Sequence, residues 1–246
     1  MSLNVAVIPD CQVRDGVPTD HLTWAGKYIA EKQPDVIVCI GDFADMPSLS
    51  SHDTGTRAFE GRRYRKDIDA ARRGMDKFVT PLGAATCYNP RMVLTLGNHE
   101  DRITRTIEGD AKLDGTISLD DLEYDKAGWT VHPFLKAVKI GGVTFCHYMT
   151  SGVMGLPCKT PASIISKHHM SCVVGHQQGK QIAYARRGDG TAITAIIAGS
   201  FYQHNEPYLK PLENVHWRGM FFLHSVHGGQ FDEMFLSIDY LKRRYK

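Results

Sequence analysis

Leu94-Thr95-Leu96-Gly97-Asn98-His99-Glu100-Asp101 is the stretch of sequence that identifies the fold class. The apolar run from Arg91 to Leu96 is typical of a buried strand, and it ends at a glycine followed by an amide, an imidazole and two carboxylates. Functional loops of α/β proteins gather at the carboxyl ends of strands. Asn98 and His99 can therefore supply a metal ligand and an acid/base group to one crevice at this strand end.

The composition is that of one soluble globular domain. The chain has 246 residues, 42% of them hydrophobic, which is enough for one large core, so we expect a single domain over residues 1–246. A formal charge of +2 does not favour nucleic acid or an anionic membrane as an obligatory partner. No signal-peptide pattern or membrane-spanning run is found, so we expect a cytoplasmic protein. The cysteines form no CxxC pair, which argues against structural zinc and a disulfide framework.

Strand and helix patterns alternate in the first half of the chain. Apolar strand patterns occur at residues 4–9, 36–40 and 91–96. Helix patterns occur at residues 18–33, 57–79, 100–108 and 118–126, and Pro81 is expected to end the second of them. This βαβ alternation predicts a parallel sheet that is covered on both faces.

The second half of the chain changes to β-hairpins. Glycine-containing turns separate paired apolar runs at residues 137–147, 181–198 and 220–238, and residues 171–175 form one further apolar run. We therefore expect an α/β fold in which two sheets pack together with helices outside. The first half should be mostly parallel and the second half richer in hairpins.

Polar side chains follow five of these strands. The five segments are Asp10-Cys11-Gln12, Gly41-Asp42-Phe43-Ala44-Asp45, Gly97-Asn98-His99-Glu100, His147 and Gly175-His176-Gln177-Gln178. Each segment alone is a weak signal, because a lone buried histidine is usually a hydrogen-bonded core residue. Together they place oxygen and imidazole donors at five strand ends, and this joint pattern favours a metal site.

The order of these motifs resembles the calcineurin-like metallophosphoesterase superfamily, whose pattern is DxH, GDxxD, GNHE, a lone histidine and GHxH. The resemblance spans Asp10 to Gln178. It implies an αββα sandwich of two mixed sheets flanked by helices, which holds two divalent metal ions. By position in the motifs, Asp42 would bridge the two ions, and Asn98, His147 and His176 would complete one site.

The second metal site departs from the family pattern. Its ligands would be Asp10, Gln12 and Gln178, and both glutamines stand where the family has histidine. A glutamine carbonyl is a neutral oxygen donor that suits manganese or magnesium and binds zinc less well than imidazole does. We therefore expect manganese, with iron, zinc, nickel or magnesium as alternatives, and weaker occupancy of this second site. The alternative is that the site stays empty and that the enzyme works with one ion or is impaired.

The resemblance also implies a reaction, the hydrolysis of a phosphoester by a metal-activated hydroxide. His99 resembles the family's acid/base histidine and would protonate the leaving oxygen, and Asp45 would orient it. Glu100 would brace the loop from behind. For Arg102 two roles are equally favoured, a contact with a substrate phosphate and an ordinary solvated salt bridge.

The substrate that we expect is a phosphoester of the nucleotide or nucleic-acid type, cleaved by a phosphodiesterase or a phosphatase. Met46-Pro47-Ser48 stands where the protein Ser/Thr phosphatases of this superfamily have an arginine, which argues against phosphoprotein substrates. An Mre11-like nuclease is an alternative within the enzyme class, although the chain lacks the length of its capping domain. A catalytically impaired metal-binding scaffold is the alternative of another class.

Two further features favour ordinary structural roles. The arginine-rich segment from Arg57 to Arg73 also contains carboxylates, so a solvated charged face is favoured over a rim that faces phosphate or nucleic acid. Tyr148 and Tyr202 flank the candidate loops and could stack on a base, but packing in the core is favoured.

Overall fold

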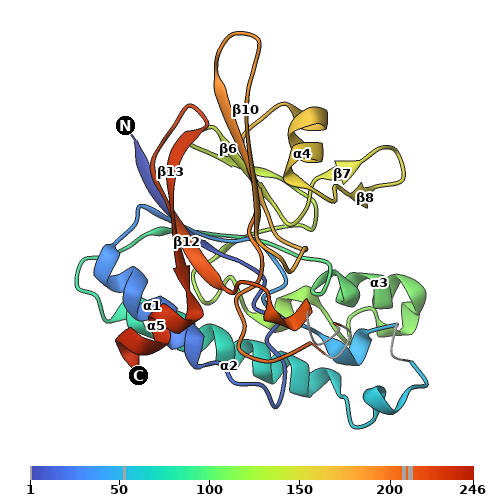
Figure 1. Cartoon of the computed structure of the whole chain (residues 1–246). Coiled ribbons are helices and arrows are strands. Elements are labelled where there is room, and N and C mark those ends of the chain that lie inside the picture. The colour runs from blue at the N-terminus through green and yellow to red at the C-terminus, as the bar shows by residue number, and fades with distance from the viewer. Residues whose placement is uncertain (1, 52–53, 207–208, 210–212) are drawn as a thin grey trace.

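Two mixed β-sheets lie face to face, and helices flank them (Figure 1). This computed structural model describes residues 2–51, 54–206, 209 and 213–246. The predicted fold class, an α/β sandwich of two mixed sheets flanked by helices, is confirmed.

The first sheet has six strands in the order β13-β12-β1-β2-β3-β4. They are β1 (Leu3–Ile8), β2 (Val36–Cys39), β3 (Arg91–Thr95), β4 (Thr130–His132), β12 (Gly219–His227) and β13 (Gln230–Ser237). The four strands from β1 to β4 are parallel, whereas β12 pairs antiparallel with β1 and with β13. The hairpin near the C-terminus therefore completes the sheet that the N-terminal half begins.

The second sheet has five strands in the order β10-β11-β9-β6-β5. They are β5 (Val138–Ile140), β6 (Val143–Cys146), β9 (Cys172–Val174), β10 (Gln181–Arg186) and β11 (Ala192–Ile197). Strands β6, β9 and β11 are parallel, and the two edge strands join them antiparallel. A separate two-stranded ribbon consists of β7 (Thr150–Ser151) and β8 (Leu156–Pro157).

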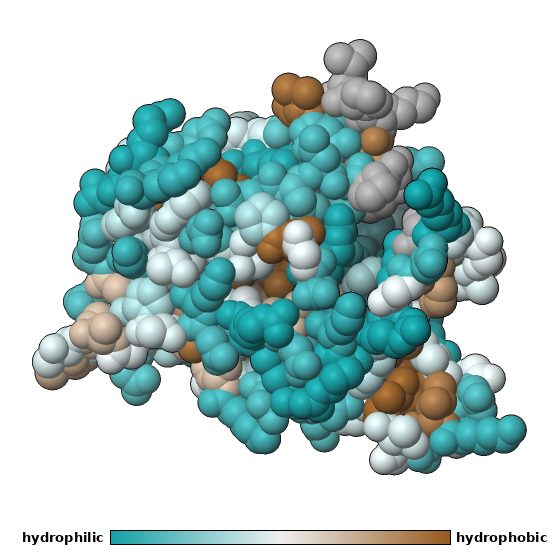
Figure 2. Space-filling view, turned by 90° about the horizontal axis from the view of Figure 1, so that it is seen from below, coloured by the Kyte–Doolittle hydropathy of each residue, from teal (hydrophilic) through white to brown (hydrophobic). Residues whose placement is uncertain are grey.

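Helices cover the outer faces of both sheets. The α-helices are α1 (Asp20–Lys32), α2 (Tyr64–Gly83), α3 (Asp101–Gly109), α4 (Pro161–His168) and α5 (Ile238–Tyr245). The short 3₁₀ turns are η1 (Pro47–Leu49), η2 (Arg57–Phe59), η3 (Ala111–Leu113), η4 (Leu119–Leu122) and η5 (Glu213–Val215). In Figure 1, α1, α2 and α5 lie below the first sheet and α4 lies beside the second. The view from below shows a mostly hydrophilic surface (Figure 2).

Successive side chains of β1 pack in two different buried clusters, one on each face of the strand. Val5 and Val7 belong to the buried cluster between the two sheets, whereas Ala6 and Ile8 belong to the cluster under the helices. Successive side chains of a strand point to opposite faces, so a strand buried on both faces is apolar throughout. This arrangement explains why β1 and β2 appear in the sequence as continuous apolar runs.

Two predicted helices are wrong in their extent. The segment expected as one helix over residues 57–79 forms η2, then a turn at Gly61 with φ +77°, and then α2, which begins at Tyr64. Pro81 does not end α2, which continues to Gly83, because a proline in the last turn removes only one backbone hydrogen bond. The helix expected over residues 118–126 is only η4 followed by turns.

Several elements were not predicted at all: the strand β4, the helices α4 and α5, the ribbon β7–β8 and the short turns η1, η3 and η5. Among the described helices, none has both the length and the apolar character that crossing a membrane requires.

Candidate metal centre

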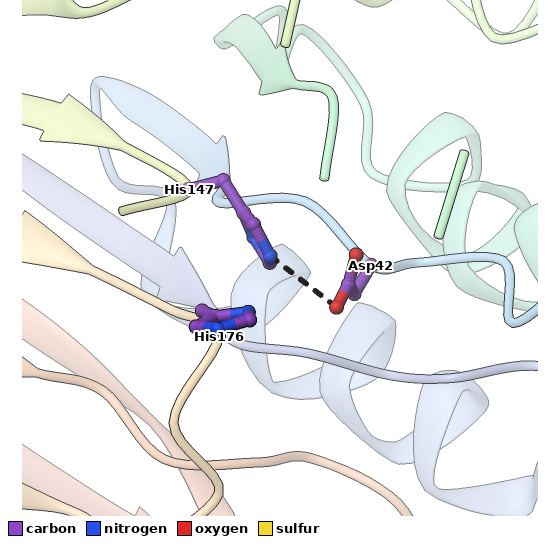
Figure 3. A group of neighbouring side chains, drawn as sticks. All are labelled: Asp42, His147 and His176. Atoms are coloured by element: carbon purple, nitrogen blue, oxygen red, sulfur yellow. Dashed lines mark ion pairs between the residues drawn. The ribbon is translucent and has the colours of Figure 1, made fainter. Parts of the chain in front are cut away.

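Three side chains with metal-binding chemistry meet at strand ends of the two sheets. Asp42 follows β2, His147 follows β6 and His176 follows β9, and the His147 ring points toward the Asp42 carboxylate (Figure 3). Their ligand atoms all lie within 4.8 Å of one another. This buried group could hold a metal ion.

Asn98, which follows β3, adds a fourth donor to this group. Its Oδ1 lies 2.9 Å from Nε2 of His147 and 2.8 Å from Nδ1 of His176. His147 Nδ1 lies 2.9 Å from the Ile40 carbonyl oxygen and donates to it, so Nε2 is the ring nitrogen that faces the cluster and would offer its lone pair to a bound cation. Ligand atoms of an amide, a carboxylate and two imidazoles thus converge, and a cation between them would satisfy all four. Because their ligand atoms converge, these four residues fit a metal ion.

The electrostatics of the cluster favour a positive charge at its centre. Burial alone would lower the pKa of His147, but the Asp42 carboxylate, 3.3 Å from its Nε2, raises that pKa to about 9. Burial likewise opposes the charge of Asp42, yet His147 and His99 hold the pKa of this carboxylate below the usual range. Burial and the charge of His147 lower the pKa of His176 to about 4, which leaves this ring neutral at pH 7.

The backbone is held in uncommon conformations at three of the predicted ligands. Gln12, Asp42 and His176 have φ of 43°, 49° and 67°, in the left-handed region that residues with a Cβ seldom adopt. Such conformations cluster at functional sites, where the surrounding structure maintains them. Gly97 permits a close approach as well, because a Cβ there would lie 2.1 Å from Oδ1 of Asp42.

The residues predicted for the second metal lie beside the first group. Asp10 is fully buried, and its Oδ1 accepts a hydrogen bond from the backbone N–H of His176 at 3.3 Å. Gln12 and Gln178 line the same cavity as Asp42. Oδ2 of Asp10 and Oε1 of Gln178 are buried and have no hydrogen-bond partner among the described residues. A cation would satisfy both oxygens, so these residues also fit a metal ion.

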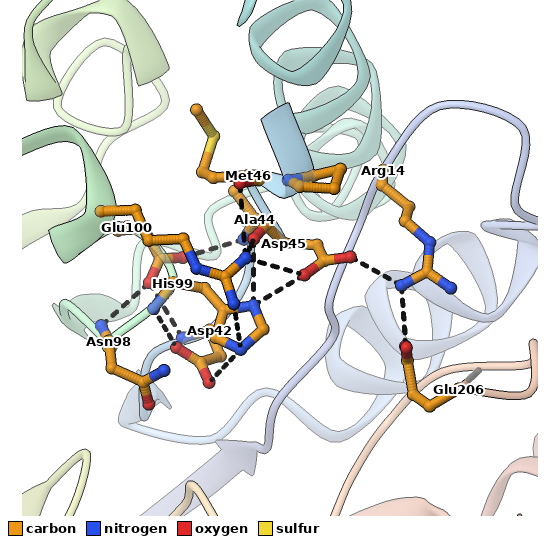
Figure 4. A network of polar contacts seen from close by, with 12 residues as sticks. Arg14, Asp42, Ala44, Asp45, Met46, Asn98, His99, Glu100 and Glu206 are labelled. Carbon is orange, nitrogen blue, oxygen red and sulfur yellow. Dashed lines mark hydrogen bonds and ion pairs between the residues drawn. The ribbon is translucent and has the colours of Figure 1, made fainter. Parts of the chain in front are cut away.

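His99 and Asp45 form a hydrogen-bonded pair at the edge of the cluster (Figure 4). Nδ1 of His99 lies 2.7 Å from Oδ1 of Asp45, and the backbone N–H of His99 donates to Oδ1 of Asp42 at 2.9 Å. Burial would lower the pKa of His99, but the two carboxylates raise it. Burial would raise the pKa of Asp45, yet His99 and Arg14 hold it below the usual range. The ring is thus fixed at Nδ1, and it lines the cavity.

Arg14 and Glu206 extend this pair, and sequence reasoning missed both. Arg14 Nη1 lies 2.6 Å from Oδ2 of Asp45 and 2.9 Å from Oε1 of Glu206, which is only 2% exposed. His204 in turn lies 2.6 Å from the same Glu206 oxygen. The position of Arg14, two residues after Gln12, could have identified it as part of the site. Glu206 lies in an irregular loop after β11, where no sequence pattern marks it.

Glu100 connects the loops that follow β2 and β3. Its side chain is fully buried and accepts the backbone N–H groups of Asp42 at 3.0 Å, Ala44 at 2.8 Å and Gly97 at 2.9 Å. The Tyr124 hydroxyl donates to it at 3.3 Å. These bonds give Glu100 the bracing position that the sequence suggested.

Arg102 binds the loop that carries Asp45. Its Nη1 donates to the Asp45 carbonyl oxygen at 2.7 Å, and its Nη2 lies 3.4 Å from Nε2 of His99. The guanidinium therefore lies against protein groups on one side and lines the cavity on the other.

Two cavities adjoin the cluster and share Asn98 and Arg102. The larger, of about 770 Å³, is also lined by His99, by the two glutamines and by Arg62, Arg63 and Lys66 from the start of the basic segment. The smaller, of about 430 Å³, is lined by Phe134 and Tyr148 among others.

The remaining aromatic and basic residues divide between surface and core. Arg65 and Arg73 pair with Asp69 and Asp15 on the surface, as a solvated charged face would. Tyr202 is completely buried and stacks on His204, so it packs in the core. His52, left without a role by the sequence, lies outside the described residues.

No protein-family model matches the chain. The chain is 33% identical over 105 residues to the Gene 54 protein of Mycobacterium phage L5, and the match covers 42% of this chain but only 38% of that protein's length. It is 26% identical over 241 residues to the Gene 54 protein of Mycobacterium phage D29, with 93% of this chain and 91% of that protein covered. A protein of known crystal structure aligns over 97% of this chain and 100% of its own, with 13% identity and a TM-score of 0.47.

Proposed function

We propose that this chain is a metal-dependent phosphoesterase of the calcineurin-like metallophosphoesterase type. The observation that carries the proposal is the convergence of Asp42, Asn98, His147 and His176 from four different strand ends. The pair of His99 and Asp45 stands directly beside this cluster. A purely structural cluster of polar residues would not need an oriented acid/base group at the edge of a cavity.

Two divalent ions, manganese by preference, are part of the proposal. One would be held by Asp42, Asn98, His147 and His176, and the other by Asp10, Gln12 and Gln178 together with Asp42. When bound, such ions supply an activated water and neutralise charge on the phosphoryl oxygens. The two neutral glutamine donors make the second site the weaker one.

His99 is the residue that would move a proton. Its hydrogen bond to Asp45 fixes the ring, so that Nε2 remains for a leaving oxygen, and its raised pKa favours the protonated form that a general acid needs. Arg102 lies against Nε2 of His99 and can contact a phosphoryl oxygen with its second amino group. Arg14 holds the other oxygen of Asp45 and thereby fixes the carboxylate that orients His99.

Hydrolysis of bis(p-nitrophenyl) phosphate and of p-nitrophenyl phosphate in the presence of Mn²⁺ tests the proposal. We expect turnover of at least one of the two compounds, and His99→Ala should reduce it by about 10²- to 10⁴-fold, the usual contribution of a general acid. The matched control is His227→Ala, because His227 is exposed at the far end of β12. Binding of Mn²⁺ without turnover of any phosphoester, or full activity of His99→Ala, would overturn the proposal.

A further inference from the structure

We infer that the smaller cavity binds the nucleoside group of a phosphodiester, on the side of the metal centre away from the leaving group. This inference rests on the proposed function, because it assigns the substrate of the same site. The cavity is about 430 Å³ in volume, within the range of small-molecule sites.

The two cavities divide a substrate at the phosphorus. Asn98 and Arg102 line both cavities, whereas His99 lines only the larger. The leaving group takes its proton from His99, so it lies in the larger cavity. The smaller cavity is then left for the second ester substituent, which a monoester does not have. The arrangement therefore favours a diester.

Aromatic rings line the smaller cavity where this substituent would enter. Tyr148 and Phe134 pack edge to face with ring centroids 5.6 Å apart, and the Tyr148 ring lies 4.9 Å from that of His176. Both aromatic side chains are partly exposed. Tyr148 thus has a surface for a planar ring next to a metal ligand, whereas the buried Tyr202 has none. Nucleobases stack on such side chains.

Polar groups that line the same cavity favour a nucleoside over an aliphatic chain. Arg105 pairs with Asp101 at 3.2 Å and donates to the Asn98 carbonyl oxygen at 2.9 Å. Both side chains line the cavity and present a donor and an acceptor to its occupant. A base or a sugar can hydrogen-bond to them, whereas a hydrocarbon chain would cover them without replacing their water.

Two substrates with the same leaving group test the inference. Thymidine 5′-(p-nitrophenyl phosphate) and methyl p-nitrophenyl phosphate differ only in the substituent that would occupy the smaller cavity. We expect the wild-type protein to favour the thymidine compound in kcat/KM by at least about 5-fold, the lower end of a base–aromatic stack. Tyr148→Leu should bring this ratio close to one, and Tyr148→Phe should keep it.

The ratio of the two kcat/KM values distinguishes a loss of specificity from general damage to the metal centre. A variant that merely disturbs the metal centre lowers both kcat/KM values together and leaves their ratio unchanged. Tyr184→Leu is the matched control, because Tyr184 is 66% exposed on β10 and lines neither cavity. This control should retain the wild-type ratio.

A binding measurement gives an answer that does not depend on turnover. Calorimetric titration should show that thymidine 5′-monophosphate binds the wild-type protein at least about 5-fold more tightly than methyl phosphate, with the difference lost in Tyr148→Leu. Equal affinities, or a wild-type kcat/KM ratio of one, would overturn the nucleoside site while leaving the phosphoesterase proposal intact. Tight nucleotide binding without hydrolysis of any phosphoester, monoester or diester, would support the site and overturn the phosphoesterase.

Discussion

Replacing Glu100 by glutamine should weaken both the fold and the metal site. The buried carboxylate accepts three backbone N–H groups at 2.8 to 3.0 Å, two on Oε2 and one on Oε1. An amide offers only one oxygen, so its best orientation still leaves the N–H of Ala44 without an acceptor. A buried donor without a partner costs about 1–3 kcal/mol, and the other two bonds lose their charge assistance. We therefore expect Glu100→Gln to lower the free energy of unfolding by about 2–4 kcal/mol.

Urea unfolding monitored by circular dichroism measures this loss, with Glu108→Gln as the control. Glu108 is exposed in α3, so its replacement should change the free energy of unfolding by less than about 0.5 kcal/mol. Because Glu100 also holds the backbones of Asp42 and Gly97, Glu100→Gln should weaken Mn²⁺ binding by about 10- to 100-fold. A stability within about 0.5 kcal/mol of the wild type would refute the reasoning, since it would mean that the three bonds contribute almost nothing.

Arg14→Leu removes the guanidinium that pairs with Asp45 at 2.6 Å. It also leaves the carboxylate of Glu206, which is only 2% exposed, without its arginine. We expect a loss of about 3–5 kcal/mol in urea unfolding, against less than about 0.5 kcal/mol for the exposed Arg65→Leu; equal losses would contradict this. His21 is 1% exposed, and burial lowers its pKa to about 4, so the native state keeps it neutral. The neutral His21 ring contributes fully to the free energy of unfolding above pH about 6.5. This contribution is lost as the pH falls toward 4, by about 3 kcal/mol in all. The variant His21→Gln should lack this part of the pH dependence of the free energy of unfolding.

Much of the fold could be predicted because its signals are local. The apolar run before Gly41 and the one before Gly97 each mark a strand and its end, and the turn at Gly141-Gly142 marks a hairpin. Helix α5 was missed because it begins directly at the end of β13, with Ser237 as its N-cap, so the apolar pattern of the hairpin continued into Ile238. Helix α4 was missed because its capping box pairs the N-cap Thr160 with Ser163, whereas the more common box has glutamate or glutamine at the position of Ser163.

The candidate site likewise contains residues that local sequence predicts and residues that only tertiary packing brings together. Asp42, Asn98, His147 and His176 follow strands directly, so the topology of the sheets brings them together without further information. Glu206 meets Arg14 across 192 residues of sequence, and no local pattern connects the two. The smaller cavity depends on where the loops carrying Phe134 and Tyr148 come to lie, which is a property of tertiary packing.

Locating manganese in crystals by its anomalous scattering tests the central claim most directly. Crystals equilibrated with a graded series of Mn²⁺ concentrations should show a first ion between Asp42, Asn98, His147 and His176. A second ion should appear only at higher concentration, at Asp10, Gln12 and Gln178. The absence of any ion at the first group of four residues at saturating Mn²⁺ would contradict the account.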